Sequence, residues 1–488
     1  MSEPEPSAGA ARPTLSALRR LLPYVRPHRA ALIGSGVAAL LASLAGLAIP
    51  LVTRAIVDGP IARGELAVLP WLALGVLAFG AVEAGLIFTR RRLVAGPSNR
   101  VEAAMRGDLF AHLQRLPMAF HDRWPSGQLL SRATSDLTTI RWFVAFSGIF
   151  LVVNVLTVVA GIGVLTWLSP WLGLVVAVAA VPLTVITGFL EQRYSGAARH
   201  AQDQVGDLAT VVEESAQGVR VLKSLGRGRE LTRAFLDQAR GLRGTELLKV
   251  RIIAMLWTVL VILPELAITT VLGVGAWGVA THALTLGTLV AAVSVITYLY
   301  WPVASLGWLL AEASNAAGAI TRYGEVRDVA PSIVDPPEPV RLRPVRGELR
   351  LRGVRFAHPG SDREILRGVD LTIRPGETMA LVGATGSGKT TLTALVPRLA
   401  DVTGGQVLLD GVDVRDIALA DLRRAVAVAF EDPVLISASV RENVALGTPR
   451  PDEAVWDALR VASADGFVAA LATRRACLLY TSPSPRDS

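Results

Sequence analysis

The sequence predicts a membrane domain of six transmembrane helices, all α-helical, followed by an incomplete α/β domain that carries a phosphate-binding loop. Two observations support this fold class. Six mostly apolar segments are each long enough, at roughly 20 residues, to cross a bilayer. A glycine-rich motif at 383–391 then follows the last of these segments. Composition agrees, because 51% of the 488 residues are apolar and only 18% are charged.

The basic balance does not indicate nucleic acid. The net charge is +8, but the positive residues lie mostly in loops beside the apolar segments, which is the pattern of membrane topology. We therefore expect no nucleic-acid partner and contact with membrane lipids. The single cysteine, Cys477, excludes an intrachain disulfide framework and a multi-cysteine metal site.

Residues 1–29 are expected to form a cytoplasmic leader. They lack the basic, apolar and small-residue regions of a signal peptide in the required order. Residues 15–29 mix apolar and basic side chains, which favours a short helix on the cytoplasmic membrane face. A solvated basic leader is the alternative.

The membrane domain is expected over 30–330. We place its six spans at about 31–56, 67–89, 142–168, 170–192, 252–279 and 286–313. Spans two and three, and spans four and five, are separated by long, arginine-rich connections, whereas the other loops are short and carry almost no basic residues. The positive-inside rule therefore places the N-terminus, both long connections and the C-terminal domain in the cytoplasm of a multi-pass protein of the cell membrane.

Both long connections have helical character. Residues 101–116 and 199–222 show apolar spacing typical of helices, so the spanning helices are expected to continue into the cytoplasm and to turn around at short segments. These tips are candidate contacts to the C-terminal domain.

A proline-rich linker is expected over 331–346, followed by the partial nucleotide-binding domain over 347–471. In that domain the sequence predicts strands at 349–356, 369–375, 378–383 and 405–411, and helices at 421–425 and 453–464. Residues 378–383 (TMALVG) are expected to be a buried strand that leads into the phosphate loop. Residues 407–410 resemble a strand ending in a magnesium-directing Asp, but Gly411 follows, so we interpret them as a hairpin strand with its polar turn.

The motif G-x-x-x-x-G-K-[ST] is matched by Gly383, Gly388, Lys389 and Thr390. Its glycines let backbone N–H groups point at phosphate oxygens, and the following helix presents its N-terminus to the same anion. Lys389 is expected to reach the β- and γ-phosphates, and the Thr390 hydroxyl to bind Mg²⁺. The predicted ATP-binding residues of the loop are Gly383, Ala384, Thr385, Gly386, Ser387, Gly388, Lys389, Thr390 and Thr391. The alternative is a glycine-rich turn without a ligand.

With these motifs in place, the chain resembles an ATP-binding cassette (ABC) exporter half-transporter of the type I/IV exporter fold. The resemblance covers about 15–471. It rests on 115–137 and 211–230, which resemble the two intracellular loops, on 365–392, which resemble the cassette core, and on 432–447, which resemble the segment after the Q-loop. It implies ATP-driven export or flipping of a small or amphipathic substrate by a homodimer, or by a heterodimer with another half-transporter.

Two residues depart from the family pattern. His358 stands where the family places an aromatic residue that stacks on adenine. A histidine there can stack on the base more weakly than that aromatic residue; the alternative is a histidine of a surface loop without this role. Glu431 stands at the Q-loop glutamine position, where a carboxylate can coordinate Mg²⁺ or orient water, or is a plain acidic residue. Glu431 is the one possible accessory to catalysis that we expect in this chain.

The third departure is the largest. The signature loop, the Walker B strand with its catalytic Glu, the D-loop and the switch His should follow about residue 471, but the sequence there is a Ser/Pro-rich tail, 472–488. We interpret the tail as a truncated reading frame joined to foreign sequence; a natural disordered tail is the alternative. The resemblance then implies that the intact parent is an ATPase, whereas this chain binds ATP without hydrolysing it.

Two acidic residues lie within predicted spans. Glu83 is in span two, and Glu265 follows Pro264 in span five. Ionisable groups at membrane depth are costly and usually face the protein interior or a cavity. We expect them to line the substrate path and to favour a cationic or amphipathic substrate, or else to form structural hydrogen bonds between helices.

Three other functions stay open from the sequence. The chain could be a non-hydrolysing, nucleotide-binding regulatory partner of another membrane protein. A soluble phosphate-loop kinase or GTPase disagrees with six spans that obey the positive-inside rule. An importer is disfavoured by the resemblance, because importers of this class usually keep the spans and the cassette on separate chains.

Overall fold

The computed structural model describes residues 15–342, 344–361, 363–431 and 434–471. The chain divides into two compact units, Met1–Ser332 and Ile333–Ser488, and each is described by itself. Residues 1–14 of the predicted leader and the whole predicted tail, with Cys477, lie outside the described residues.

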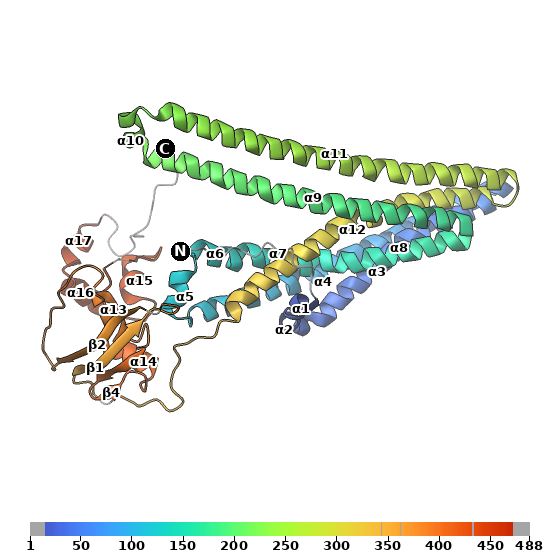
Figure 1. Cartoon of the computed structure of the whole chain (residues 1–488). Helices are drawn as coiled ribbons and strands as arrows, with labels where there is room; N and C mark the ends of the chain where they lie inside the picture. The colour runs from blue at the N-terminus through green and yellow to red at the C-terminus, as the bar shows by residue number, and fades with distance from the viewer. Residues whose placement is uncertain (1–14, 343, 362, 432–433, 472–488) are drawn as a thin grey trace. The chain divides into compact units, whose positions relative to one another are not determined.

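Six long helices build the first unit (Figure 1). They are α3 (Arg29–Ile56), α4 (Leu69–Leu113), α8 (Gly148–Leu168), α9 (Pro170–Gln217), α11 (Gly228–Ala280) and α12 (Leu286–Arg327). Within the described ranges, six helical segments are long and apolar enough to cross a membrane, and each contains one predicted span. The six predicted spans are therefore confirmed as helices of membrane-spanning length and composition.

Shorter helical segments precede or join the long ones. They are α1 (Leu15–Arg19), α2 (Leu22–Val25), η1 (Arg26–His28), η2 (Val57–Ile61), η3 (Leu66–Val68), α5 (Met118–Arg123), α6 (Ser126–Ser131), η4 (Arg132–Asp136), α7 (Leu137–Trp142), η5 (Phe143–Ser147) and α10 (Val219–Leu225). The segments η2, η4 and η5 are π-helical. Helix α6 runs through η4, α7 and η5 into α8 as one helical path, Ser126–Leu168. The helices over 15–28 agree with the predicted short helical leader, and their place on the membrane face stays a prediction.

Helices α9 and α11 are much longer than a bilayer requires. They contain 48 and 53 residues, which at 1.5 Å per residue is about 72 and 80 Å, against a hydrocarbon core of about 30 Å. The two helices lie side by side and are joined at one end by α10 (Figure 1). The connection between spans four and five is therefore helical, as predicted, and a large part of it must lie outside the hydrocarbon core.

Helix α12 packs against α3, α8, α9 and α11. Small residues allow this: a Cβ atom at Gly307 would lie 3.0 Å from the backbone nitrogen of Gly188, and one at Gly161 would lie 2.6 Å from the Leu299 side chain. Asn154 of α8 also donates a hydrogen bond to Ser305 Oγ of α12, at 2.7 Å. Close packing of small residues and interhelical hydrogen bonds hold membrane helices together where hydrophobic burial does not.

A second packed region joins the short N-terminal helices to the end of α12. Its core consists of apolar side chains from α1, the turn before α2, α4, α5, α7 and α12, among them Leu21, Met105, Leu137 and Ile320. The region therefore connects segments about 300 residues apart in the sequence, next to the point where α12 ends.

Four charges reinforce the same region. The Asp136 carboxylate of η4 accepts two hydrogen bonds from the Arg322 guanidinium of α12, one of them from Nε at 3.0 Å. Arg132 donates to the Arg322 carbonyl oxygen at 3.1 Å and to Glu325 Oε2 at 2.9 Å. The Arg132 guanidinium also lies 4.3 Å from the Trp124 ring centroid. We call Arg132, Asp136, Arg322 and Glu325 the charge clamp.

The second unit contains a four-stranded antiparallel sheet, in the order β2-β1-β3-β4. Its strands are β1 (Leu349–Ala357), β2 (Glu364–Ile373), β3 (Gly404–Leu409) and β4 (Val412–Asp413). Asp410 and Gly411 both have positive φ, at 48° and 83°, which is the geometry of a two-residue hairpin turn. The Asp410 carboxylate accepts hydrogen bonds from the backbone of Arg346, Gly347 and Glu348. The interpretation of 407–410 as a hairpin strand with a polar turn is confirmed.

Five short helices accompany the sheet: α13 (Lys389–Leu395), α14 (Leu419–Ala425), α15 (Val440–Ala445), α16 (Asp452–Val461) and α17 (Asp465–Ala469). Leu392, Leu395 and Leu422 from α13 and α14 pack with apolar residues of β1, β2 and β3 into one core. The helices predicted at 421–425 and 453–464 agree with α14 and α16.

The expected linker, 331–346, has little regular structure but contacts the second unit. Val340 forms an isolated bridge with Ile417. The Asp335 carboxylate accepts a hydrogen bond from the Leu419 amide, at the start of α14, at 2.7 Å. The division between the two units falls at Ser332 and Ile333, near the start of this segment.

One predicted strand is wrong. Residues 378–383 are neither hydrogen-bonded into a sheet nor buried, and Val382 is 89% exposed. A central strand needs a neighbour on each side. A second apolar segment, 426–430, also forms no strand, and its Phe430 is 66% exposed. Apolar character indicated a strand, but among the described residues no partner strand completes a sheet there.

Candidate nucleotide-binding site

The loop at 383–391 adopts a conformation that only glycine accepts easily. Gly386 and Gly388 have φ values of 83° and 90°, in the left-handed region. A Cβ atom at Gly388 would lie 2.9 Å from Leu366 Cδ2 and 3.0 Å from Ile365 Cγ2. Gly388 therefore has to be glycine for two reasons, its left-handed backbone conformation and its close contact with β2.

Lys389, the first residue of α13, folds back over the loop. Its ammonium group donates hydrogen bonds to the carbonyl oxygens of Gly383 at 2.7 Å and Ala384 at 3.0 Å, and to Ser387 Oγ at 3.4 Å. A lysine in this position holds the loop closed on itself by charge-assisted hydrogen bonds. It can exchange these acceptors for phosphate oxygens, which carry more negative charge.

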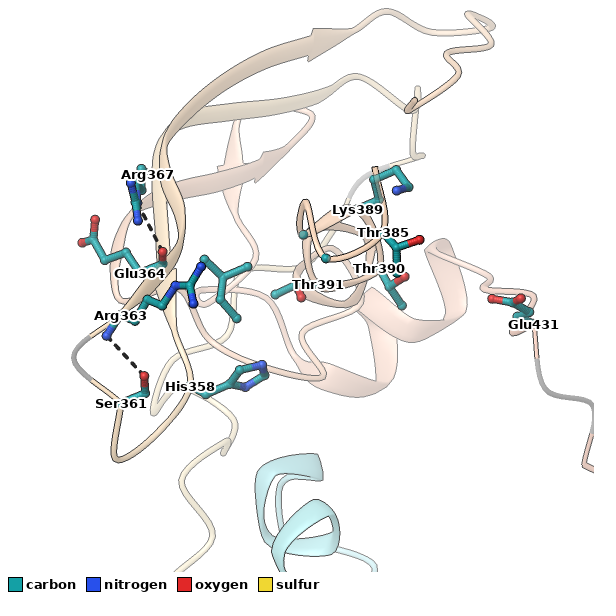
Figure 2. A pocket seen from close by; sticks show the side chains of 13 residues that line it. His358, Ser361, Arg363, Glu364, Arg367, Thr385, Lys389, Thr390, Thr391 and Glu431 are labelled. Carbon is teal, nitrogen blue, oxygen red and sulfur yellow. Dashed lines mark hydrogen bonds between the residues drawn. The ribbon is translucent and has the colours of Figure 1, made fainter. Parts of the chain in front are cut away.

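A cavity of about 900 Å³ opens beside the loop (Figure 2). It is lined by His358, Ser361, Arg363, Glu364, Ile365, Arg367, Thr385, Gly386, Gly388, Lys389, Thr390, Thr391 and Glu431. Of the residues predicted from the sequence, it unites the second half of the motif with His358 and Glu431. Gly383, Ala384 and Ser387 lie in the loop and contact Lys389 instead.

His358 follows β1 at the other end of the cavity. Its ring packs edge-on against Phe356, with centroids 5.3 Å apart and an interplanar angle of 82°, and Phe356 is buried in the core of the second unit. Phe356 therefore supports the imidazole ring where it borders the cavity, and a planar group can stack on that ring.

The cavity suits a magnesium ion bound together with phosphates. Glu431 and the Thr390 hydroxyl both line it, and Mg²⁺ is usually held by one or two protein oxygen ligands together with phosphates and water. No group of three or more His, Cys, Asp or Glu side chains in the described ranges could hold a metal by itself. Thr390 and Glu431 offer oxygen donors of the kind that a nucleotide-bound Mg²⁺ takes from a protein.

The sequence did not indicate five lining residues, Ser361, Arg363, Glu364, Ile365 and Arg367. They come from the turn before β2 and from β2 itself. They border the cavity because the phosphate loop packs against Ile365 and Leu366 at Gly388. The spacing of residues in the sequence does not reveal that contact, so these five residues are identified only from the structure.

The two intramembrane carboxylates lie on different helices. Glu83 is half-buried on α4, and Glu265, after Pro264, is exposed on α11. Within the described part of the chain, neither forms a hydrogen bond or an ion pair, and neither lines the cavity beside the phosphate loop. Their part in a substrate path stays a prediction.

Six membrane-length helices, followed on the same chain by a phosphate-loop unit, define a membrane protein with a nucleotide-binding type of domain. Comparison with known families agrees. Residues 32–303 match the model of the ABC transporter transmembrane region, and residues 366–477 match the ABC transporter model. The chain belongs to the ABC transporter family.

Relatives with a known name share much of the chain. A multidrug efflux ATP-binding/permease protein of Mycobacterium bovis is 36% identical over 453 residues, which are 92% of this chain and 37% of the relative. An ATP-dependent lipid A-core flippase of Thiobacillus denitrificans is 31% identical over 440 residues, 89% of this chain and 75% of the relative. The same-named protein of Syntrophus aciditrophicus is 28% identical over 453 residues, with 92% and 75% covered. The chain thus spans little more than a third of the mycobacterial protein and three quarters of the flippases.

Proposed function

We propose that the chain is half of a dimeric ABC exporter, which uses ATP to export or flip a small or amphipathic substrate across the cell membrane. Membership of the family supports this, as do relatives named for multidrug efflux and for lipid A flipping. The observation that carries the proposal is the phosphate loop, with Lys389 and two left-handed glycines beside a cavity large enough for a nucleotide.

The geometry of the loop supports the roles that we propose for its residues. The backbone N–H groups around Gly386 and Gly388 bind the phosphates, and Lys389 leaves the Gly383 and Ala384 carbonyl oxygens to reach them. Thr390 and Glu431 ligate Mg²⁺, which neutralises phosphate charge. Gly383, Ala384, Thr385, Ser387 and Thr391 shape the loop, and His358 stacks on the base.

Hydrolysis is proposed for the intact transporter, and binding without hydrolysis for the 488-residue chain alone. The carboxylates among the described lining residues are Glu364 and Glu431. Glu364 is paired with Arg355 at 3.0 Å, so only Glu431 is available to orient water, and it is exposed. In this proposal an intact partner half, which is either a full-length copy of the same protein or a different half-transporter, completes the ATP site.

We place the N-terminus, both long helical connections and the second unit in the cytoplasm. The arginine-rich connections after spans two and four support this orientation, because short external loops carry few basic residues. ATP is available on that side.

ATP-dependent dye accumulation in inverted membrane vesicles tests the proposal. Vesicles from cells that produce the intact transporter should accumulate an amphipathic cationic dye when Mg²⁺–ATP is added. Lys389→Ala should abolish that accumulation. Equal accumulation with the variant would reject the proposal. Nucleotide binding without any transport would instead favour a regulatory partner of another membrane protein.

The same vesicles test the substrate path. Glu83→Gln and Glu265→Gln should reduce the accumulation of cationic dyes several-fold while leaving neutral amphiphiles unchanged, because each change removes a negative charge at membrane depth. Glu230→Gln, in an exposed ion pair at the far end of α11, is the control. Equal loss for cationic and neutral dyes would show a structural role for both carboxylates.

A further inference from the structure

The cavity beside the phosphate loop is lined by two arginines, Arg363 and Arg367, besides Lys389, and the nucleotide motif explains neither. Arg363 lies in the turn before β2, where its backbone amide donates a hydrogen bond to Ser361 Oγ at 3.2 Å. Its side chain is exposed and lines the cavity. Figure 2 shows its guanidinium turned toward the phosphate loop, on the same side as the His358 ring.

The other cations around this cavity already have acceptors. Arg367 donates to the Glu364 carbonyl oxygen at 3.3 Å, and Arg355 pairs with the Glu364 carboxylate at 3.0 Å. Lys389 is held by the loop carbonyl oxygens. Within the described part of the chain, the Arg363 side chain makes no hydrogen bond or ion pair. Its planar fork of N–H donors is therefore available to a ligand.

Arg363 and His358 lie at the same end of the proposed nucleotide site. A nucleotide whose phosphates occupy the loop extends its base along the cavity toward the His358 ring, which Phe356 supports edge-on. If the base stacks on the imidazole face, a neighbouring side chain meets the edge of the base. Among the arginine and lysine side chains that line this cavity, Arg363 is the one that makes no hydrogen bond or ion pair within the described part of the chain.

Guanine and adenine differ in the hydrogen-bonding groups that this edge of the base presents. A guanidinium only donates hydrogen bonds. Guanine presents two acceptors, N7 and O6, to such a fork, whereas adenine presents one acceptor, N7, beside the N6 amino donor. We propose that Arg363 reads the base and makes this site favour purine triphosphates with an oxygen at position six, such as GTP, over ATP. The inference rests on the proposed nucleotide site and adds its base selectivity.

Competition binding to the 488-residue chain in lipid nanodiscs tests the inference. ATP, GTP, ITP and 7-deaza-GTP each displace the fluorescent analogue TNP-ATP in the presence of Mg²⁺. We expect GTP and ITP to bind about tenfold more tightly than ATP, which lies within the range for a bidentate arginine contact. ITP should match GTP because it keeps O6 and N7, and 7-deaza-GTP should lose most of the advantage because it lacks N7.

Three variants assign the effect to Arg363. Arg363→Ala should bring GTP and ATP to equal affinity. Arg363→Gln should shift the preference toward ATP, since an amide can donate to N7 and accept from the N6 amino group. Arg367→Ala is the matched control, because this arginine of β2 lines the same cavity but its Nε already bonds to a carbonyl oxygen, and the variant should keep the GTP preference.

The outcomes separate the two proposals. Equal affinity for GTP and ATP, or a GTP preference that survives Arg363→Ala, overturns the base-reading role while the nucleotide site stands. Displacement of TNP-ATP by no nucleotide overturns both the nucleotide site and the inference.

Discussion

At the scale of single residues, the phosphate loop depends on two glycines that are not equivalent. Gly386 has open space where a Cβ would lie, whereas Gly388 faces Leu366 and Ile365 within 3.0 Å. Both have positive φ. Sequence matching gives the motif positions, but only the structure distinguishes these two roles.

This difference predicts which of two alanine variants loses more stability and more affinity for ATP. Gly386→Ala should cost about 1–2 kcal/mol through backbone strain alone. Gly388→Ala adds a clash with β2, so it should destabilise the second unit further and weaken ATP binding more. Thermal unfolding and nucleotide titration of both variants measure this. Equal effects of the two substitutions would contradict the packing of the loop against β2.

Asp413 illustrates a residue that stabilises the second unit through its charge. Burial alone would raise the pKa of its carboxyl group. Hydrogen bonds from the Arg415 side chain and backbone, with the positive charges of Arg415 and Arg398, outweigh burial and lower that pKa below its ordinary value. A carboxyl with a depressed folded pKa stabilises the fold above its unfolded pKa, near 4, and the stabilisation is lost as pH falls through the folded pKa.

We therefore expect Asp413→Asn to destabilise the chain at pH 7 by about 1–2 kcal/mol, and by less at pH 3, where the wild-type carboxyl gains protons. Denaturant unfolding at the two pH values measures the difference. A variant whose deficit does not shrink at pH 3 would show that the ionised carboxylate is not the stabilising species.

At the scale of elements, the sequence predicts long helices well and single strands less well. Each predicted span lies on a helix because an uninterrupted apolar run of about 20 residues has few alternative structures. The strand at 378–383 was wrong because a strand depends on neighbours that its own residues do not specify. The motif could locate the glycine-rich loop and its lysine. It could not indicate Arg363 or the charge clamp, because both depend on contacts between distant segments.

A substitution in the charge clamp should lower the free energy of unfolding more than a substitution in an exposed ion pair. The Asp136 side chain is 8% exposed and holds Arg322, so Asp136→Asn should destabilise the first unit by about 1–3 kcal/mol. Arg227→Ala breaks a pair exposed by more than 60% on both sides and should cost less than about 0.5 kcal/mol. Thermal unfolding in detergent compares the two variants. The swap Asp136→Arg with Arg322→Asp should recover part of the loss, and no recovery would mean that the pair contributes little.

At the scale of the whole molecule, orientation in the membrane follows from the alternation of arginine-rich and short connections. Ser224 lies in α10, between α9 and α11, and His282 lies between α11 and α12; both are exposed. In a Cys477→Ser background, Ser224→Cys should react with a membrane-impermeant maleimide only from the cytoplasmic side, and His282→Cys only from outside. The reverse pattern would contradict the positive-inside assignment.

The central claim is that a chain with six membrane-length helices binds nucleotide through Lys389 and its loop. Equilibrium binding of radiolabelled ATP with Mg²⁺ to the purified chain in nanodiscs tests it most directly, with Lys389→Ala as the variant. We predict saturable binding by the chain and a loss of affinity of at least about tenfold in the variant, as expected for removal of a charge-assisted phosphate contact. Absence of saturable binding, or equal binding by the variant, would contradict the account.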